Sequence, residues 1–209
     1  MDEYYHVCNR GVLKRDIFLD DRDRARFLFL LLTLQSPGHT PHNISGSVSY
    51  FIKHRMFNIS ERTRTKIKTG QGVQLSSFML RPNHFHLLVK EVQEGGVAKY
   101  LQRLGNAYTK YFNTKYKQNG HLFQGPYRSV HIENNDQLLY ASAYIHKHGP
   151  IGYEWSSYQD YVKSNRWPEL LGRSLILEQF TDPKEYYEWV RNSTAKEISE
   201  NIEHPMLDI

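Results

Sequence analysis

Hydrophobic and polar positions along the chain fall into short strand-like stretches separated by longer helical ones. Residues 4–8 alternate weakly between polar and apolar side chains, and residues 73–80, 85–91 and 128–133 are also strand-like. An Arg-Pro-Asn tripeptide separates the second stretch from the third and favours a tight turn. These two stretches are therefore predicted to pair as a hairpin.

Helical spacing of apolar residues appears between these strands and after the last one. Asp20 or Asp21 is suited to cap the start of one helix, and Asn134, Asn135 or Asp136 that of another. Gly149 followed by Pro150 is a helix stop. The predicted helices span about residues 21–35, 96–118, 135–148 and 183–192.

The order of these elements is strand, helix, strand pair, helix, strand, helix. It predicts an α+β fold in which helices cover one face of an antiparallel sheet. Residues 36–72 interrupt the order, since they are rich in Gly, Ser, Asn and Pro and then in basic residues. We expect an insertion with some helix there, inside a main domain over residues 1–152. Residues 153–209 are expected to form a C-terminal extension that packs on the same domain.

The composition is compatible with a nucleic-acid partner. The formal net charge is +5, and 13% of the residues are aromatic, among them 15 tyrosines. Basic groups attract phosphates, and aromatic rings stack on unpaired bases. An aromatic-rich core explains the same composition equally well, so composition alone does not decide between the two interpretations.

The single cysteine, Cys8, excludes an internal disulfide and a thiolate metal site. The N-terminus has no apolar signal region, and the apolar run at 27–34 is too short to span a bilayer. We therefore expect a cytoplasmic protein that has no membrane partner.

Two histidines stand two residues apart in the third strand-like stretch. Residues i and i+2 of a strand point to the same face, so His84 and His86 present their imidazoles side by side. Two neutral imidazoles at this spacing can share one divalent metal ion. A polar strand surface is the alternative interpretation of the pair.

The predicted helix that precedes Gly149 carries further residues that could act together with the histidine pair. Tyr140, Tyr144 and His148 follow one another at intervals of four residues and so share one helix face. If this face packs against the hairpin, it supplies a nucleophile and a third imidazole. The alternative is that both tyrosines are ordinary core residues.

The sequence resembles a known family at several places in the same order. The decapeptide Leu-Arg-Pro-Asn-His-Phe-His-Leu-Leu-Val at 80–89 resembles the signature of single-tyrosine HUH transposases, in particular REP-associated tyrosine transposases and their insertion-sequence relatives. Other matching segments lie at 5–11, 17–27, 120–129, 144–146 and 155–158. The resemblance covers about residues 4–162, apart from the 36–72 insertion.

The resemblance implies a ferredoxin-like or RRM-like HUH nuclease core over residues 1–152. It also implies a metal-dependent nuclease and transposase that cleaves and rejoins single-stranded DNA, with hairpin or palindromic sequences as its targets. Tyr144 would be the nucleophile that forms a 5′-phosphotyrosine. His84, His86 and His148 would hold Mg²⁺ or Mn²⁺, because phosphate oxygens favour the former and imidazoles the latter.

Three positions depart from the family pattern. Arg81 stands where a methionine is usual, and His148 stands where relatives often have an amide side chain that reaches the metal. Arg128 is followed directly by Ser129, so the lysine that is usual before this serine is missing. The histidine keeps a metal ligand, although it changes the metal preference that we expect.

Candidate DNA contacts are the basic residues near the predicted site and in the insertion. They are Arg128, Lys110, Lys115, Lys117, Arg62, Arg64 and Lys66. A solvated helix face explains each of the helical ones equally well. Two other functions stay open, a hairpin-binding module for DNA or RNA without cleavage and a small RNA-binding protein that needs no metal. The sequence also leaves open whether the chain acts as a monomer or as a homodimer.

Overall fold

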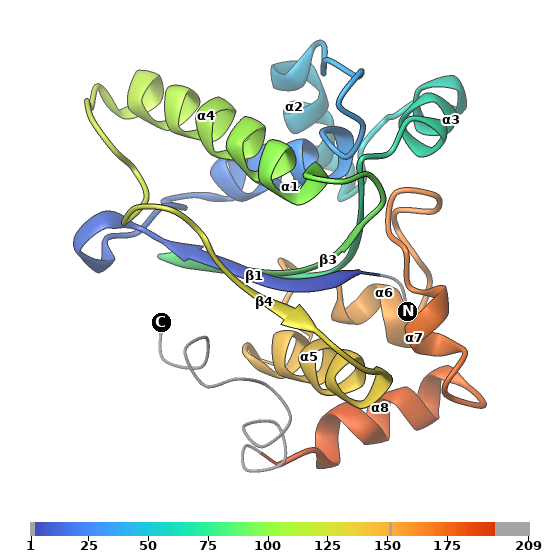
Figure 1. Ribbon diagram of the computed structural model, residues 1–209. Coiled ribbons are helices and arrows are strands. Elements are labelled where there is room, and N and C mark those ends of the chain that lie inside the picture. Colours follow the sequence, from blue (N-terminus) through green and yellow to red (C-terminus); the bar gives the residue numbers. More distant parts are fainter. Residues whose placement is uncertain (1–2, 151, 195–209) are drawn as a thin grey trace.

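A computed structural model describes residues 3–150 and 152–194 (Figure 1). The predicted C-terminal extension is therefore described only as far as Thr194, and its remaining residues lie outside the described part. No helix in the described part is long and apolar enough to cross a bilayer.

Four antiparallel strands form the sheet at the centre of the molecule. They are β1 (Tyr4–Arg10), β2 (Val73–Arg81), β3 (His84–Glu91) and β4 (Arg128–Ile132), in the order β2-β3-β1-β4. The predicted hairpin is confirmed, since β2 and β3 are joined only by Pro82 and Asn83. The amides of Ile17 and Phe18 donate to the carbonyl of Pro82 at 2.8 and 3.0 Å, which holds the hairpin tip in place.

Two long helices, α1 (Asp21–Thr33) and α4 (Gly96–Tyr116), cover one face of this sheet (Figure 1). The helix α1 begins where the Asp20 side chain accepts a hydrogen bond from the Asp23 amide, as the sequence predicts. Phe85 of β3 points to this layer, where its ring centroid lies 5.0 Å from that of Phe27 in α1. The order β1-α1-β2-β3-α4-β4 is that of a ferredoxin-like unit, which confirms the predicted α+β fold.

A third helix, α5 (Asn135–Lys147), lies on the opposite face of the sheet (Figure 1). Its start is capped as predicted, with the Asn134 side chain accepting from the Gln137 amide at 2.9 Å. The expectation that helices cover only one face is therefore wrong. A strand pattern shows which residues are apolar, but in β2 and β3 both faces are buried, so a second helical layer is needed.

The remaining elements lie in the 36–72 segment, in the extension and in a short turn after β1. They are the 3-10 helix at Val12–Lys14, α2 (Ile44–His54), α3 (Glu61–Thr69), α6 (Tyr158–Val162), α7 (Ser174–Leu177) and α8 (Pro183–Asn192). The segment and the extension meet around buried Phe51, whose ring centroid lies 5.6 Å from that of Trp155. Arg55 of the segment forms ion pairs with Glu154 of the extension and with Asp21 of α1.

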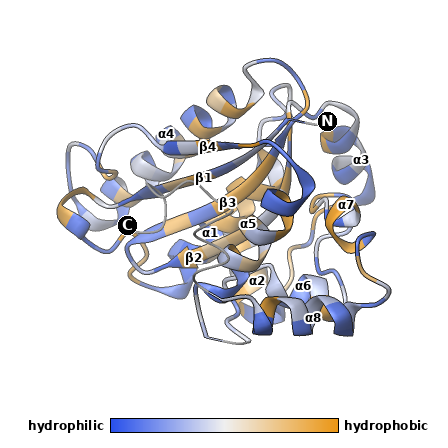
Figure 2. Cartoon of the chain, turned by 60° about the horizontal axis from the view of Figure 1, so that its bottom comes forward, coloured by the Kyte–Doolittle hydropathy of each residue, from blue (hydrophilic) through white to orange (hydrophobic). Residues whose placement is uncertain are grey.

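The extension also lengthens the hydrogen-bonded edge of the sheet. The Phe78 carbonyl on β2 accepts from the Ser157 amide at 3.0 Å, and the Leu80 amide donates to the Trp155 carbonyl at 2.9 Å. Figure 2 shows hydrophobic residues gathered along the strands of the sheet. The extension therefore covers what would otherwise be an exposed strand edge of an apolar sheet.

Candidate active site

The two histidines of β3 lie on the sheet face that α5 covers. His84 is nearly buried and His86 is 0% exposed, and their ring centroids are 5.2 Å apart. The residue between them, Phe85, packs against the opposite helical layer. The alternation of a strand therefore brings both imidazoles under α5, as their spacing predicts.

His148 joins this pair from the C-terminal end of α5. It is the residue that follows the helix, and its amide donates to the Tyr144 carbonyl at 3.0 Å. Its Nε2 lies 2.9 Å from Nε2 of His84, and its ring centroid lies 4.7 Å from that of His86. One ring nitrogen from each histidine lies within 4.8 Å of the other two, so the three can bind a single ion.

Tyr144 lies one helical turn before His148 and faces the same cluster. Its ring centroid is 5.3 Å from those of both His86 and His148, and the residue is 9% exposed. Tyr140, the other tyrosine of this helix face, has its ring 5.0 Å from Trp189 of α8. The structure therefore brings Tyr144 next to the histidines and places the Tyr140 ring against the extension.

His6 of β1 is a further member of the cluster, and the sequence analysis missed it. It is fully buried, its Nε2 lies 3.0 Å from Nδ1 of His86, and its ring centroid lies 5.5 Å from that of Tyr144. Its contact with His86 depends on the register of β1 against β3. The only signal in the sequence is that a histidine occurs within a predicted strand.

Hydrogen bonds to the histidines leave metal-binding nitrogens available. The Asn83 side-chain oxygen lies 2.7 Å from Nδ1 of His84, so a proton on this nitrogen leaves Nε2 with its lone pair. Within the described part of the chain, the buried Nε2 of His86 has no hydrogen-bond partner. A buried nitrogen without a partner, next to two other imidazoles, fits the coordination of a metal cation.

All three candidate ligands favour the neutral form that binds metal. Burial, with smaller contributions from the nearby His148, Arg81 and Arg10, lowers the pKa of His84 to about 4. Burial also places the pKa of His86 well below its usual range, and it lowers that of His148 with a smaller contribution from Arg81. Neutral imidazoles at physiological pH do not have to release a proton before they coordinate a metal.

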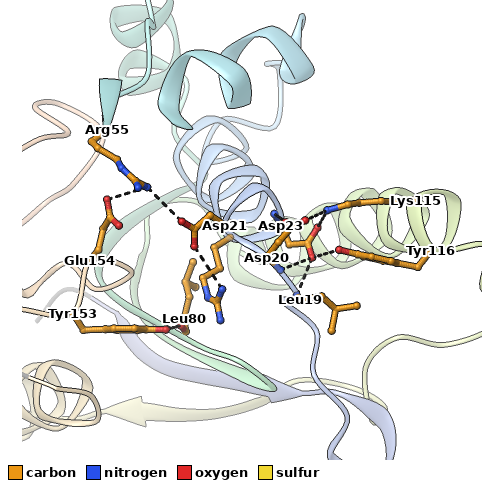
Figure 3. A network of polar contacts seen from close by, with 11 residues as sticks. Leu19, Asp20, Asp21, Asp23, Arg55, Leu80, Lys115, Tyr116, Tyr153 and Glu154 are labelled. Atoms are coloured by element: carbon orange, nitrogen blue, oxygen red, sulfur yellow. Dashed lines mark hydrogen bonds and ion pairs between the residues drawn. The ribbon is translucent and has the colours of Figure 1, made fainter. Parts of the chain in front are cut away.

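The basic residues predicted on the long helix lie in the other helical layer. Lys110 and Lys115 belong to α4, and Lys117 follows it, so the sheet separates them from the histidines. Lys115 donates to the carboxylates of Asp20 and Asp23, both at 2.7 Å (Figure 3). The structure thus does not bring these lysines to the histidine cluster.

The remaining candidate DNA contacts are divided between α3 and β4. Arg62, Arg64 and Lys66, the α3 basic residues, lie on α3, where Arg64 is 3.7 Å from the Glu169 carboxylate. Arg128 is exposed on β4 and is paired in register with Cys8, which in turn is paired with His86. Directly opposed residues point to the same face, so Arg128 is on the histidine side of the sheet.

Comparison with known proteins gives a family match over the central part of the chain. Residues 46–148 match the model of the family described as IS200-like transposases. No curated protein matches the chain. One solved structure, a REP-associated tyrosine transposase bound to a REP hairpin, is similar with a TM-score of 0.46 and 10% sequence identity, covering 83% of this chain and 87% of that chain.

The family match includes much of the site. It contains both histidines of β3, the whole of α5 with Tyr144, and His148, whereas β1 with His6 lies before it. By this match, the central part of the chain, with most of the candidate site, is similar to the IS200-like transposase family.

Proposed function

We propose that the protein is a metal-dependent tyrosine transposase that cleaves and rejoins single-stranded DNA. The observation that carries the proposal is the position of Tyr144, whose ring lies 5.3 Å from the rings of two histidines in a cluster of three, two of them buried. A nucleophile beside a group of neutral ligands is the arrangement that phosphoryl transfer through a covalent intermediate needs.

In the proposed reaction, the Tyr144 oxygen attacks the phosphorus of a phosphodiester. A bond from that oxygen to phosphorus forms while the bond to the 3′-oxygen breaks. The 3′-oxygen leaves with the bonding electrons and gains a proton, and the tyrosine hydroxyl loses one. The products are a 5′-phosphotyrosine and a free 3′-hydroxyl, and attack by a 3′-hydroxyl reverses the step without an added energy source.

His84, His86 and His148 would hold the cation, for which we propose Mg²⁺ or Mn²⁺. When bound, such a cation stabilises negative charge on phosphate oxygens. The protein's own part is orientation, since Asn83 contacts Nδ1 of His84 and His6 contacts Nδ1 of His86. These contacts direct the opposite ring nitrogens toward one another.

A single strand, free or beside a hairpin, is the substrate that we propose. His86 is 0% exposed and Tyr144 only 9% exposed, so the phosphate has to approach a nearly closed site. A duplex is stiff over about 150 base pairs, whereas an unpaired strand bends readily toward such a site. Hairpin or palindromic targets follow from the family resemblance.

The proposal is tested with end-labelled hairpin oligonucleotides in the presence of Mn²⁺. The wild-type protein should form a covalent adduct that survives denaturation, and Tyr144→Phe should form none while it still binds the DNA. Tyr140→Phe is the matched control, because it removes the same hydroxyl from the same helix and should keep most of the activity.

Two outcomes would contradict the proposal. An adduct formed by Tyr144→Phe, or one that peptide analysis maps to another tyrosine, would refute the assignment of the nucleophile. DNA binding by the wild type without cleavage under any metal condition would instead identify a binding module.

A further inference from the structure

Two arginines flank His84 in the sheet. Arg10 of β1 is paired with His84 of β3, and Arg81 of β2 is paired with the same histidine from the other side. Directly opposed residues of antiparallel strands point to the same face. The three residues therefore form a row across three strands, named here the Arg10–His84–Arg81 row, on the face that carries the histidine cluster.

The charge of this row is not balanced by acidic groups. Among the described residues, neither Arg10 nor Arg81 has a carboxylate within ion-pair distance, and both are half-buried. The positive charge of Arg81 contributes to lowering the pKa of both His84 and His148, which agrees with its position beside the cluster. The two guanidinium groups lie beside a candidate site for a metal cation, and this concentration of positive charge favours the binding of an anion there.

The two guanidinium groups differ in how they are held. Arg10 donates from its Nε to the Gln124 side-chain oxygen, in the loop that precedes β4. Arg81 has no hydrogen bond from its side chain within the described part of the chain. One arginine is thus fixed before any ligand binds, and the other has all its donors available to a ligand.

We propose that Arg10 and Arg81 bind phosphate groups of the DNA strand on the two sides of His84. The inference rests on the proposed function, because the strand is the one whose scissile phosphate Tyr144 attacks. Neighbouring strands lie about 4.8 Å apart, so the two arginines are separated by about 10 Å along the row. They therefore contact different phosphate oxygens or successive phosphates, and position the strand across the cluster.

Arginine suits this role because its planar fork can donate two parallel hydrogen bonds to one phosphate. A guanidinium on each side of His84 would therefore hold the strand next to its scissile phosphate with two charged contacts.

Equilibrium binding on a Tyr144→Phe background tests the inference separately from cleavage. A fluorescent single-stranded oligonucleotide is titrated by anisotropy with Mn²⁺ present, at several NaCl concentrations. Arg10→Ala and Arg81→Ala should each weaken binding about tenfold and reduce the slope of log affinity against log salt by about 0.7. Arg81→Lys should restore the slope but only part of the affinity, because the charge remains and the bidentate geometry is lost.

Arg191→Ala is the matched control, since it removes one exposed arginine from α8. It should leave affinity and slope unchanged. Thermal unfolding identifies any variant that fails to fold, and Arg10→Lys and Arg10→Gln then replace Arg10→Ala, with the slope expected to fall only in the Gln variant.

Cleavage by the wild type tests the proposed function, and the salt slopes of the arginine variants test the phosphate contacts. A wild type that does not cleave, combined with reduced salt slopes in the two arginine variants, would remove the proposed function and retain the phosphate-binding row. Slopes equal to that of Arg191→Ala in both variants would overturn the row, whether or not the wild type cleaves.

Discussion

Replacement of His6 tests how the buried hydrogen bonds around the candidate metal ligands contribute to metal affinity. For His86 to bind a metal through Nε2, its Nδ1 has to carry the proton and donate it to Nε2 of His6, which lies 3.0 Å away. In His6→Leu this N–H has no acceptor in a fully buried position. The variant therefore no longer holds His86 in the tautomer that coordinates through Nε2.

The expected effect of His6→Leu is a loss of about 10- to 100-fold in Mn²⁺ affinity, which is typical for the loss of a hydrogen bond to a ligating histidine. This corresponds to about 1.4 to 2.7 kcal/mol of binding free energy. His6→Gln should recover part of the loss, because its side-chain oxygen can accept from Nδ1 of His86. The recovery distinguishes a role in orientation from a general effect on packing.

Calorimetric titration with Mn²⁺ at neutral pH measures these affinities for the wild type and both variants. Thermal unfolding without metal shows whether each variant is folded at the temperature of the titration. A folded His6→Leu protein with wild-type Mn²⁺ affinity would refute the argument. Equal losses in the Leu and Gln variants would show that His6 acts only through packing.

Three further predictions concern acid stability, the α4 lysine and the insertion. Burial lowers the pKa of His6 and of His146 to about 3, so the unfolding free energy should fall below pH 6.5 by about 1.4 kcal/mol per pH unit for each group and level off near pH 3. Chemical denaturation across this pH range should show a less steep decline in His146→Gln than in the wild type. A curve unchanged by this substitution would exclude His146 as a source of the decline. Lys115→Ala should lower the unfolding free energy by about 2 kcal/mol. This is less than the full cost of an unpaired buried charge, because Asp23 keeps hydrogen bonds from two tyrosine hydroxyls. Urea titration measures the unfolding free energy, and no change would show that the ion pair is dispensable. Replacement of the α3 basic residues with alanine should weaken DNA binding and flatten its salt dependence, and an unchanged slope in anisotropy would remove α3 from the DNA interface.

Features that depend on local sequence were predicted well. The hairpin follows from a short turn between two strand-like stretches, and α5 begins at the predicted Asn134 cap. The shared face of His84 and His86 follows from the period of a strand alone. Helix geometry likewise places Tyr144 and His148, four residues apart, on one face, so the sequence predicts that they lie together.

Features that depend on strand register and on the choice of sheet face could not be predicted. The contact of His6 with His86 and the Arg10–His84–Arg81 row both arise from how β1 and β2 align with β3, which no single segment encodes. Neither does the sequence of α5 specify which face it covers. Charge alone makes the lysines of α4 candidate DNA contacts, and the sheet places them on its other side.

The position of Tyr144 and His148 on one helix couples two parts of the site mechanically. Because α5 is a rigid rod and His148 directly follows it, any rotation or shift of the rod displaces both residues together. The rod is tied to the extension by buried His146, which bonds to Ser157 and Tyr186, and by Lys147, which reaches the carbonyl end of α8. Under the proposed function, loosening the extension would therefore reduce metal affinity and misplace the Tyr144 oxygen in the same event.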